Sequence, residues 1–295
     1  MRHIDRIRYL HKLVQANRKT VVVDVGANPL GSPPIYSHLR KSGVAQIIGF
    51  EPQPKALEAL NAAAGPHETY LPYAVGAGTE ETLHLTKDSG LVSTLEPDPW
   101  IATYLSSWWR KAIEVRQTVP ITTKRLDEIT EIDRIDFLKI DIQGGELNVF
   151  RNAREKLAAT ALIQTEIPLI RYYKGQPSFG DVQSELESQG FLAHQIIQTR
   201  AHYVGYPLKL AESFRPKASQ TTVVDLAFLR NPANMASLPL DTVQHMAILA
   251  DAVLHAHDLV FRCLGELVRR KIVHAPSVGE YIELVRNTLY SKQKA

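Results

Sequence analysis

The sequence predicts an α/β fold with a doubly wound, mostly parallel seven-stranded sheet and a C-terminal helical appendage. Two observations predict it. Short apolar runs alternate with helical patterns through about residue 230, as in successive strand-helix units. Beyond Pro239, apolar residues recur at helical spacing but without the regular heptads of a coiled coil.

The composition is that of an ordinary globular protein. The chain has 295 residues, of which 44% are hydrophobic and 22% are charged. The net charge of +3 includes no long basic run, so we expect no nucleic-acid partner. No apolar run approaches the roughly 20 residues of a membrane span. Cys263 is the only cysteine and the first residues are too charged for a signal peptide, so we expect a cytoplasmic protein.

The pattern divides the chain into a leader helix (1–19), a main domain (20–230) and a helical appendage (231–295). Within the main domain, the less regular segment 79–126 is interpreted as an insertion near the acceptor site. Ser32 is the expected N-cap of the first helix after the leader, with Pro33 and Pro34 in its first turn. The expected strands cover residues 21–25, 46–50, 68–75, 83–86, 115–121, 136–141, 161–167, 191–197 and 221–229. The other expected helices cover residues 54–64, 100–110, 146–157, 179–189 and 240–290.

Three acidic residues stand at the ends of predicted strands. Asp24, Glu51 and Asp141 each follow or close an apolar run, and ligands of open parallel sheets bind at the carboxyl ends of the strands. The loop 26–31 fits the dinucleotide pattern G-x-G-x-x-G except that Asn28 replaces the second glycine, which allows the backbone to approach a pyrophosphate. The pattern therefore favours a nucleoside cofactor without a pyrophosphate.

S-adenosyl-methionine meets these requirements. Glu51, at the end of the second strand, can accept hydrogen bonds from two ribose hydroxyls. Asp24, next to a glycine turn, suits the cationic amino group of the methionine part. Each strand-end acid alone could equally be a solvated cap, but the three together favour a cofactor site.

Four stretches resemble the FkbM family of methyltransferases. They are Asp24-Val25-Gly26-Ala27-Asn28, Phe50-Glu51-Pro52, Arg125-Leu126-Asp127-Glu128-Ile129 and the run Asp136-Phe137-Leu138-Lys139-Ile140-Asp141-Ile142-Gln143-Gly144-Gly145-Glu146. The resemblance covers about residues 20 to 230 and implies a Rossmann-like class I methyltransferase. It departs from the family in a longer first loop at residues 29–34, and in Gln143, which stands where many members have Glu.

The resemblance also implies roles for individual residues. The first motif would surround the methionine part of the cofactor, the acid of the second would hold the ribose, and the loop after the third strand would lie along the adenine. The candidate cofactor-binding residues are Asp24, Gly26, Ala27, Asn28, Glu51, Pro52, Ala74, Val75 and Asp141.

Methyl transfer to a hydroxyl gains from a general base close to the methyl group. Asp141 is the first candidate, with the alternative that it only caps the following helix. Glu166, near the end of the next strand, is the second. Lys139 shares a strand face with Asp141 and is expected to pair with a neighbouring acid. Asp141 and Glu166 could also share a divalent cation, a question that we leave open.

The remaining aromatic and histidine residues give weaker signals. No histidine pair has metal-ligand spacing together with an acid, so zinc is not indicated. Trp100, Trp108 and Trp109 favour packing over an acceptor pocket. The Tyr172-Tyr173-Lys174 cluster is a candidate for the far rim of that pocket.

The sequence therefore predicts an S-adenosyl-methionine-dependent O-methyltransferase. By resemblance, the acceptor is a hydroxyl of a sugar, glycan or polyketide-type molecule. Two alternatives remain. One is a nicotinamide-dependent oxidoreductase, although this sequence lacks the catalytic Tyr-x-x-x-Lys that such enzymes need at a suitable place. The other is a non-catalytic cofactor-binding or assembly protein. The C-terminal helices could pack on their own domain or form a homo-oligomer.

Overall fold

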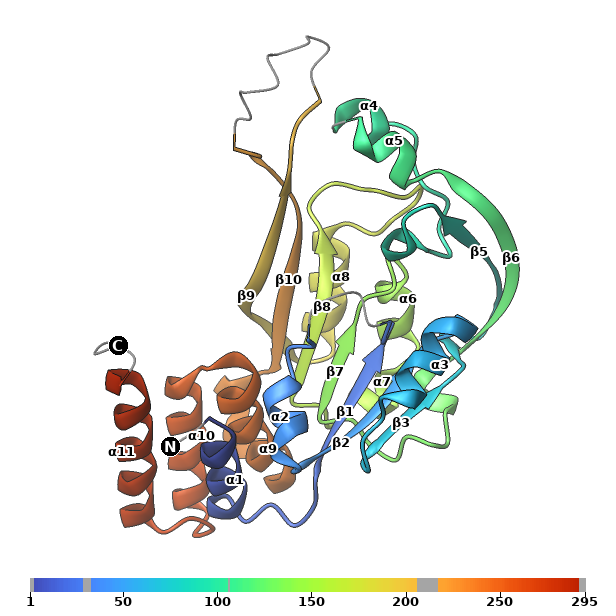
Figure 1. Cartoon of the computed structure of the whole chain (residues 1–295). Coiled ribbons are helices and arrows are strands. Elements are labelled where there is room, and N and C mark those ends of the chain that lie inside the picture. Colours follow the sequence, from blue (N-terminus) through green and yellow to red (C-terminus); the bar gives the residue numbers. More distant parts are fainter. Residues whose placement is uncertain (1–2, 29–32, 106, 206–216, 292–295) are drawn as a thin grey trace.

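A seven-stranded sheet forms the centre of the protein in a computed structural model that describes residues 3–28, 33–105, 107–205 and 217–291 (Figure 1). In spatial order, its strands are β3 (Glu68–Leu71), β2 (Ala45–Phe50), β1 (Thr20–Val25), β7 (Phe137–Ile140), β8 (Leu162–Pro168), β10 (Gln220–Arg230) and β9 (Phe191–His202). The first five pair in parallel, and β10 runs antiparallel to both of its neighbours. This confirms the predicted fold class.

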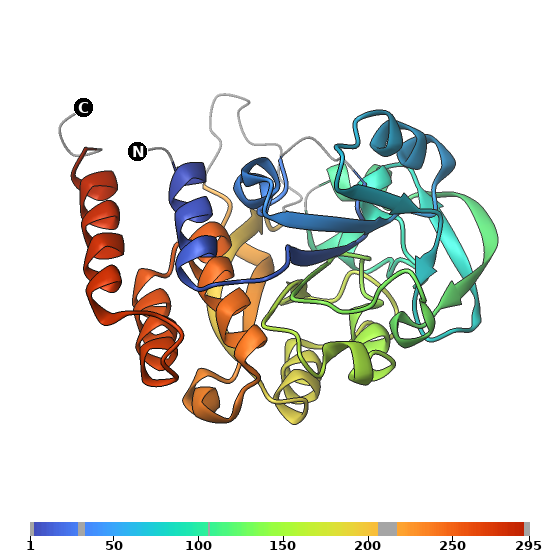
Figure 2. The same cartoon turned by 90° about the horizontal axis from the view of Figure 1, so that it is seen from below.

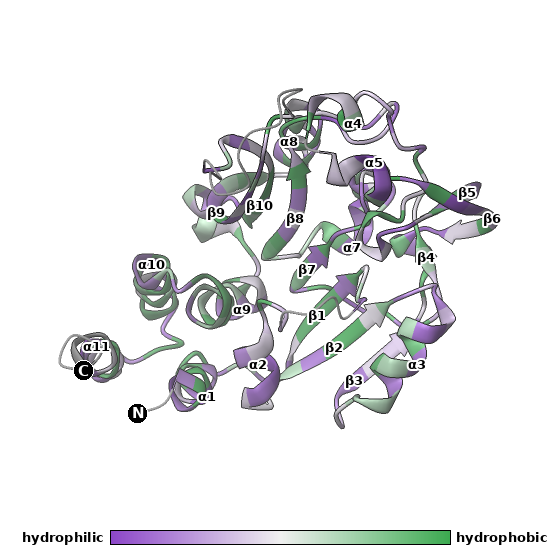
Figure 3. Ribbon diagram, turned by 45° about the horizontal axis from the view of Figure 1, so that its top comes forward, coloured by the Kyte–Doolittle hydropathy of each residue, from purple (hydrophilic) through white to green (hydrophobic). Residues whose placement is uncertain are grey.

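Helices cover both faces of the sheet, so its central strand is buried throughout (Figure 3). On one face Val22 packs in a core with α1 (His3–Leu13), α2 (Ser37–Ser42), α9 (Leu240–Leu249) and the π-helix η4 (Ala250–Leu254). On the other face Val23 packs with α6 (Glu146–Arg151), α7 (Arg154–Leu157) and α8 (Phe179–Ser188). Because side chains alternate along a strand, Asp24 belongs to the face of α1 and α2.

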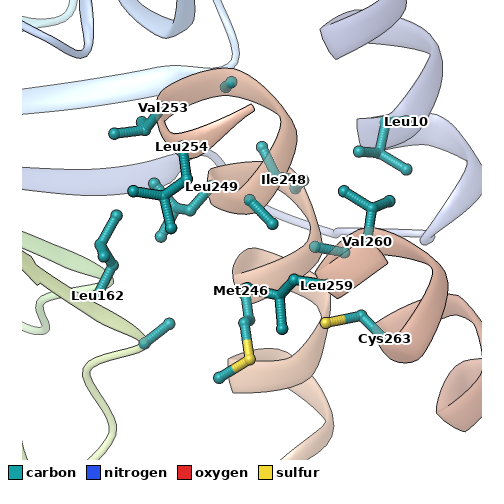
Figure 4. Packing of buried hydrophobic residues seen from close by; sticks show 14 of the residues in the cluster. Leu10, Leu162, Met246, Ile248, Leu249, Val253, Leu254, Leu259, Val260 and Cys263 are labelled. Carbon is teal, nitrogen blue, oxygen red and sulfur yellow. The ribbon is translucent and has the colours of Figure 1, made fainter. Parts of the chain in front are cut away.

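The C-terminal helices share the first of these cores. In Figure 4, Leu249 and Leu254 lie on the side of Leu162 of β8, and Val260 lies toward Leu10 of α1. Figure 2 shows α1 beside α11 (Ala275–Ser291), and α10 (His257–Arg269) packs against α9 in the same core. The boundary at residue 230 stays a prediction. No helix in the described ranges is long and apolar enough to cross a membrane.

The segment after β3 builds a second, three-stranded sheet beside the main one. Its order is β4 (Ala74–Val75), β6 (Val115–Lys124) and β5 (Glu80–Thr86). The predicted single strand over residues 68–75 is wrong: it ends at Leu71, because Pro72 has no N–H for a ladder, and residues 74–75 pair with β6 instead. The rest of the segment holds the helices η1 (Ser89–Leu91), α4 (Ile101–Tyr104), α5 (Trp108–Ala112) and η2 (Leu126–Glu128).

Several predicted helices begin or break elsewhere. The predicted helix over residues 100–110 is divided into α4 and α5, and that over 146–157 into α6 and α7. The second break has a visible cause, because Asp127 accepts hydrogen bonds from the backbone N–H of Glu155 and Lys156 and so caps α7. The prediction that Pro33 and Pro34 lie in the first turn of α2 is wrong, since α2 begins only at Ser37; Ser32 lies outside the described residues. The remaining helices are α3 (Pro54–Ala62) and η3 (Pro232–Ser237).

A buried ion pair joins α1 to the π-helix. The Arg6 guanidinium donates to both carboxylate oxygens of Asp251, at 2.6 to 3.1 Å, and both side chains are almost fully buried. His3 contacts the Asp251 carbonyl oxygen at 3.2 Å. Burial lowers the pKa of His3 to about 4, against the opposing charge of Asp251 and with help from Arg6 and His255. His3 is therefore neutral at pH 7.

This shift predicts a pH-dependent effect of His3→Gln on stability. The unfolded chain binds the His3 proton near its ordinary pKa of about 6.5, but the folded protein binds it only near 4, so protonation favours unfolding. The His3 contribution is fully present above pH 6.5 and is lost as the pH falls toward 4. The variant should gain roughly 2–3 kcal/mol of unfolding free energy relative to the wild type across this window.

The measurement is urea unfolding of both proteins at each pH. Buried acids whose pKa is raised, such as Glu146, act in the opposite direction, so the difference between variant and wild type is the quantity to follow. The same change at the exposed His67 is the control. A constant difference between pH 7 and pH 4 would contradict the assignment.

Candidate active site

A cavity of about 560 Å³ opens at the carboxyl ends of the central strands. Its size is typical of a small-molecule site, and its place is where ligands of open parallel sheets bind. Asp24, Glu51 and Asp141, from the ends of three neighbouring strands, all line it. Nine of the ten sequence-predicted site residues do so: Asp24, Gly26, Ala27, Asn28, Glu51, Pro52, Ala74, Val75 and Asp141. Glu166 is the exception.

Gly26 brings the three strand ends together. Its N–H and that of Ala27 donate to the carbonyl of Phe50, which ties the end of β1 to the end of β2. Its φ of +82° lies in the left-handed region, and a Cβ there would stand 2.1 Å from the carbonyl oxygen of Asp141. Only glycine allows this close approach, which fixes the spacing between the ends of β1 and β7.

Asp24 is 3% exposed and already has two partners. Tyr36 donates its hydroxyl to Oδ2 at 2.6 Å, and the Lys139 Nζ lies 3.0 Å from Oδ1. Lys139 also donates to the Gly26 carbonyl. Burial acts to lower the pKa of Lys139, but the charges of Asp24 and Asp141 outweigh it and raise that pKa. The prediction that Lys139 pairs with a neighbouring acid is confirmed.

Glu51 has a simpler environment. It is 2% exposed, and the backbone N–H of Gln53 donates to its Oε1 at 2.8 Å. Burial raises the pKa of this carboxyl, while the Gln53 hydrogen bonds and the Lys139 charge partly offset the rise. Glu51 lines the cavity, so its carboxylate can be reached by a ligand there.

The wall beside Glu51 is formed by the second sheet. Ala74 and Val75 pair with β6, and Gly76 lies so close to Thr123 that a Cβ would stand 2.8 Å from the Thr123 Cβ. The Tyr73 ring stacks on Phe50 with 6.1 Å between ring centres. Tyr73, Ala74, Val75 and Phe50 thus line the cavity next to the Glu51 carboxylate.

Asp141 and Glu166 are linked by the side chain of Gln143. Its Nε2 donates to Asp141 Oδ1 at 2.8 Å and to Glu166 Oε1 at 3.0 Å. Glu166 does not line the cavity: it is buried behind Gln143 and forms an ion pair with Arg200. Burial, then the charge of Asp141, raise the pKa of Glu166 well above its ordinary value, and Arg200 only partly offsets this. Glu166 therefore contacts the cavity residues through the side chain of Gln143.

Several lining residues were not predicted from the sequence. Tyr36, Gln198 and Arg200 line the cavity but are distant in the chain from the strand-end acids, and no local pattern marks them. Conversely, none of the three tryptophans lines it. Trp109 is buried against Tyr172, which agrees with the favoured packing interpretation, whereas Trp100 and Trp108 are exposed. The longer loop at residues 29–32 lies outside the described residues.

One group of possible metal ligands occurs in the described chain, and it is away from the cavity. Asp136, Asp241 and His245 have ligand atoms within 4.8 Å of one another. The Arg18 guanidinium donates to both of these carboxylates, so a cation of the protein itself already occupies the group. We assign it a structural role.

The comparisons with known proteins agree with this geometry. The sequence model of the methyltransferase FkbM domain matches residues 24–193. The 2-O-methyltransferase NoeI of Sinorhizobium fredii (strain NBRC 101917 / NGR234) is 25% identical over 169 residues, which are 53% of this chain and 66% of NoeI. The chain thus spans just under two thirds of the length of this relative.

Solved structures show distant similarity. Magnesium protoporphyrin IX methyltransferase from Synechocystis PCC 6803, with bound SAM, is 13% identical with a TM-score of 0.35, covering 78% of this chain and 80% of its own. Precorrin-6y C5,15-methyltransferase from Geobacter metallireducens GS-15 is 12% identical with a TM-score of 0.34, covering 76% and 87%.

The Gly26 contact predicts a large effect of Gly26→Ala. Gly43→Ala is the matched control, because Gly43 also has a positive φ (+77°) but nothing lies within 4 Å of a Cβ there. The control should cost about 1–2 kcal/mol of unfolding free energy, the usual penalty of a left-handed alanine. Gly26→Ala should cost about 3 kcal/mol or more, because strain and a backbone clash add. Urea unfolding measures both, and equal costs would show that the contact with Asp141 is not tight.

Proposed function

Because the chain belongs to the FkbM methyltransferase domain family, we propose that it transfers a methyl group from S-adenosyl-methionine to a hydroxyl oxygen. One observation carries the proposal: Asp24, Glu51 and Asp141, all within the matched segment 24–193, line one cavity at adjacent strand ends. The relative NoeI is a 2-O-methyltransferase, which supports oxygen as the acceptor atom. By resemblance, the acceptor is a sugar, glycan or polyketide-type molecule.

The residues of the cavity fit the cofactor. Glu51 would accept hydrogen bonds from the ribose, and Ala74 and Val75 would lie along the adenine. Asp24, which lines the cavity at the end of β1, would bind the amino group of the methionine part beside its contacts with Tyr36 and Lys139. When bound, S-adenosyl-methionine supplies a methyl group that its positive sulfur activates. The surrounding carboxylates favour this positive charge.

Asp141 is the group placed to manage the proton of the acceptor. Gln143 occupies its Oδ1, and no donor in the described chain is bound to its other oxygen. That oxygen can accept the hydroxyl proton as the new bond forms. Glu166, the second predicted base, does not reach the cavity and is proposed only to support Asp141 through Gln143.

The ribose contact is tested by Glu51→Ala. Loss of hydrogen bonds to a charged group should weaken S-adenosyl-methionine binding by roughly 1–3 kcal/mol. Isothermal titration calorimetry measures this, with Glu58→Ala on the exposed side of α3 as the control. A second titration, with NAD, tests the oxidoreductase alternative, and absence of binding to both ligands would favour an assembly protein. Unchanged affinity in Glu51→Ala would remove this residue from the ribose site.

The base is tested by Asp141→Asn, which keeps the shape and removes the proton acceptor. Turnover should fall about 10²–10⁴-fold, the usual contribution of a general base, while the affinity for S-adenosyl-methionine changes little. Asp133→Asn, on the exposed loop before β7, is the control. The assay follows isotopically labelled methyl groups into candidate glycans by mass spectrometry. An equal loss of turnover and cofactor affinity would reassign Asp141 to cofactor binding.

A further inference from the structure

Gln143 is held in an unusual backbone conformation between β7 and α6. Its φ of +60° lies in the left-handed region, which residues other than glycine rarely adopt, and Gly144 follows with +109°. The Ser93 hydroxyl, from the segment after η1, donates to the Gln143 carbonyl at 2.7 Å. The surrounding structure therefore fixes this residue although its conformation is unfavourable, and such strain is often stored where a side chain must point in one direction.

The amide end of Gln143 is also fixed. Tyr173, which is 2% exposed, directs its hydroxyl toward Gln143 Oε1 at 3.0 Å and the Leu91 carbonyl at 3.1 Å. With its oxygen toward Tyr173, the amide presents its NH₂ group to Asp141 and Glu166. A Gln amide can be turned by 180°, but the opposite orientation would bring its oxygen against two carboxylates. The two acids therefore decide the orientation, and the Tyr173 hydroxyl, which can donate or accept, is compatible with it.

An NH₂ group between two carboxylates occupies the position that a bridging cation would take. Two carboxylates and a third oxygen donor are the ligands that Mg²⁺ or Ca²⁺ prefers, whereas an amide NH₂ cannot ligate a cation. Arg200 supplies the remaining positive charge through its ion pair with Glu166. Glu166 therefore has two cationic or amide donors from the chain itself, whereas Asp141 has one, on Oδ1.

We propose that Gln143 is a positioning residue that holds the Asp141 carboxylate for proton transfer and stands in place of a divalent cation, so that methyl transfer by this protein requires no such cation. The inference rests on the proposed function, in which Asp141 accepts the acceptor proton. Gln143 acts through Asp141 and is not itself a catalytic residue.

Gln143→Glu tests the position of the amide without requiring activity. The change replaces the NH₂ group with a carboxylate oxygen. Three carboxylate groups then face one another and should create a cation site. Calorimetric titration with MnCl₂ or CaCl₂ should detect binding at least about tenfold tighter than in the wild type, within the roughly 10⁻⁴–10⁻³ M range of weak protein sites. Gln117→Glu on the exposed strand β6 is the charge-matched control. Equal cation affinity in the two variants would overturn the inference.

Tyr173→Phe tests the orientation of the amide. It removes the hydroxyl and keeps the ring, so kcat should fall about tenfold while the dissociation constant of S-adenosyl-methionine stays within about twofold of the wild type. A purely structural role for Tyr173 would lower the stability and change both quantities. An unchanged kcat would contradict the inference.

The wild-type metal dependence separates this inference from the function on which it rests. Methyl transfer should proceed at the same rate with EDTA and with added MgCl₂. If EDTA abolishes transfer and MgCl₂ restores it, the inference is wrong and the methyltransferase function stands. If the protein binds no S-adenosyl-methionine and no acceptor is methylated, the proposed function fails. The cation titration of Gln143→Glu still tests whether the Gln143 amide occupies the position of a bridging cation.

Discussion

The ion pair of the half-buried Lys139 ammonium group is the interaction on which the site depends. Several acidic side chains lie near the carboxyl ends of the strands. Without a nearby positive charge, burying their negative charges would cost too much free energy. Lys139 pairs directly with Asp24, and the charges of Asp141 and Asp225 also act on it. The same side chain donates to the Gly26 carbonyl, so it also holds the turn after β1. Lys139 thus contributes both to the charge balance and to the backbone geometry in the middle of the sheet.

This arrangement explains why the carboxylates behave differently. Burial raises the pKa of Glu51 and that of Glu166, and Glu166 also faces the charge of Asp141. Lys139 partly offsets the rise at Glu51, whereas Arg200 does so at Glu166. The proposed cofactor side and the proposed acceptor side of the cavity therefore have separate half-buried cations. A ligand with a positive sulfur adds a further positive charge between them.

The central sheet could be predicted from the sequence because its strands are buried on both faces. Such strands are short, continuous apolar runs, and the acids at their ends are visible at once. The same reasoning failed at residues 68–75, where Pro72 marks the break but the apolar run continues. Tyr36, Gln198 and Arg200 could not have been placed in the cavity, because their contacts depend on how distant segments fold back. A local pattern carries no information about such contacts.

The C-terminal helices show a similar limit. Their periodicity identified a buried face but not what covers it, since an apolar stripe looks the same against its own sheet or another chain. In the structure, Leu249 and Leu254 belong to the same core as Leu162 of the sheet. The first layer of these helices is therefore part of the main fold. Whether copies of the chain associate through the outer helices stays a prediction.

Some residues that line the cavity lie outside the segment that matches the family model. The strand-end acids lie in the segment that matches the family model, residues 24–193, but Gln198 and Arg200 lie beyond it on β9. β9 is an edge strand of the sheet, and most of its residues are exposed and free to vary without loss of the core. Relatives can therefore share the residues proposed to bind the cofactor and to act as the base while they differ at the cavity residues on β9. The similarity to a 2-O-methyltransferase therefore supports the proposed reaction type more strongly than the proposed acceptor.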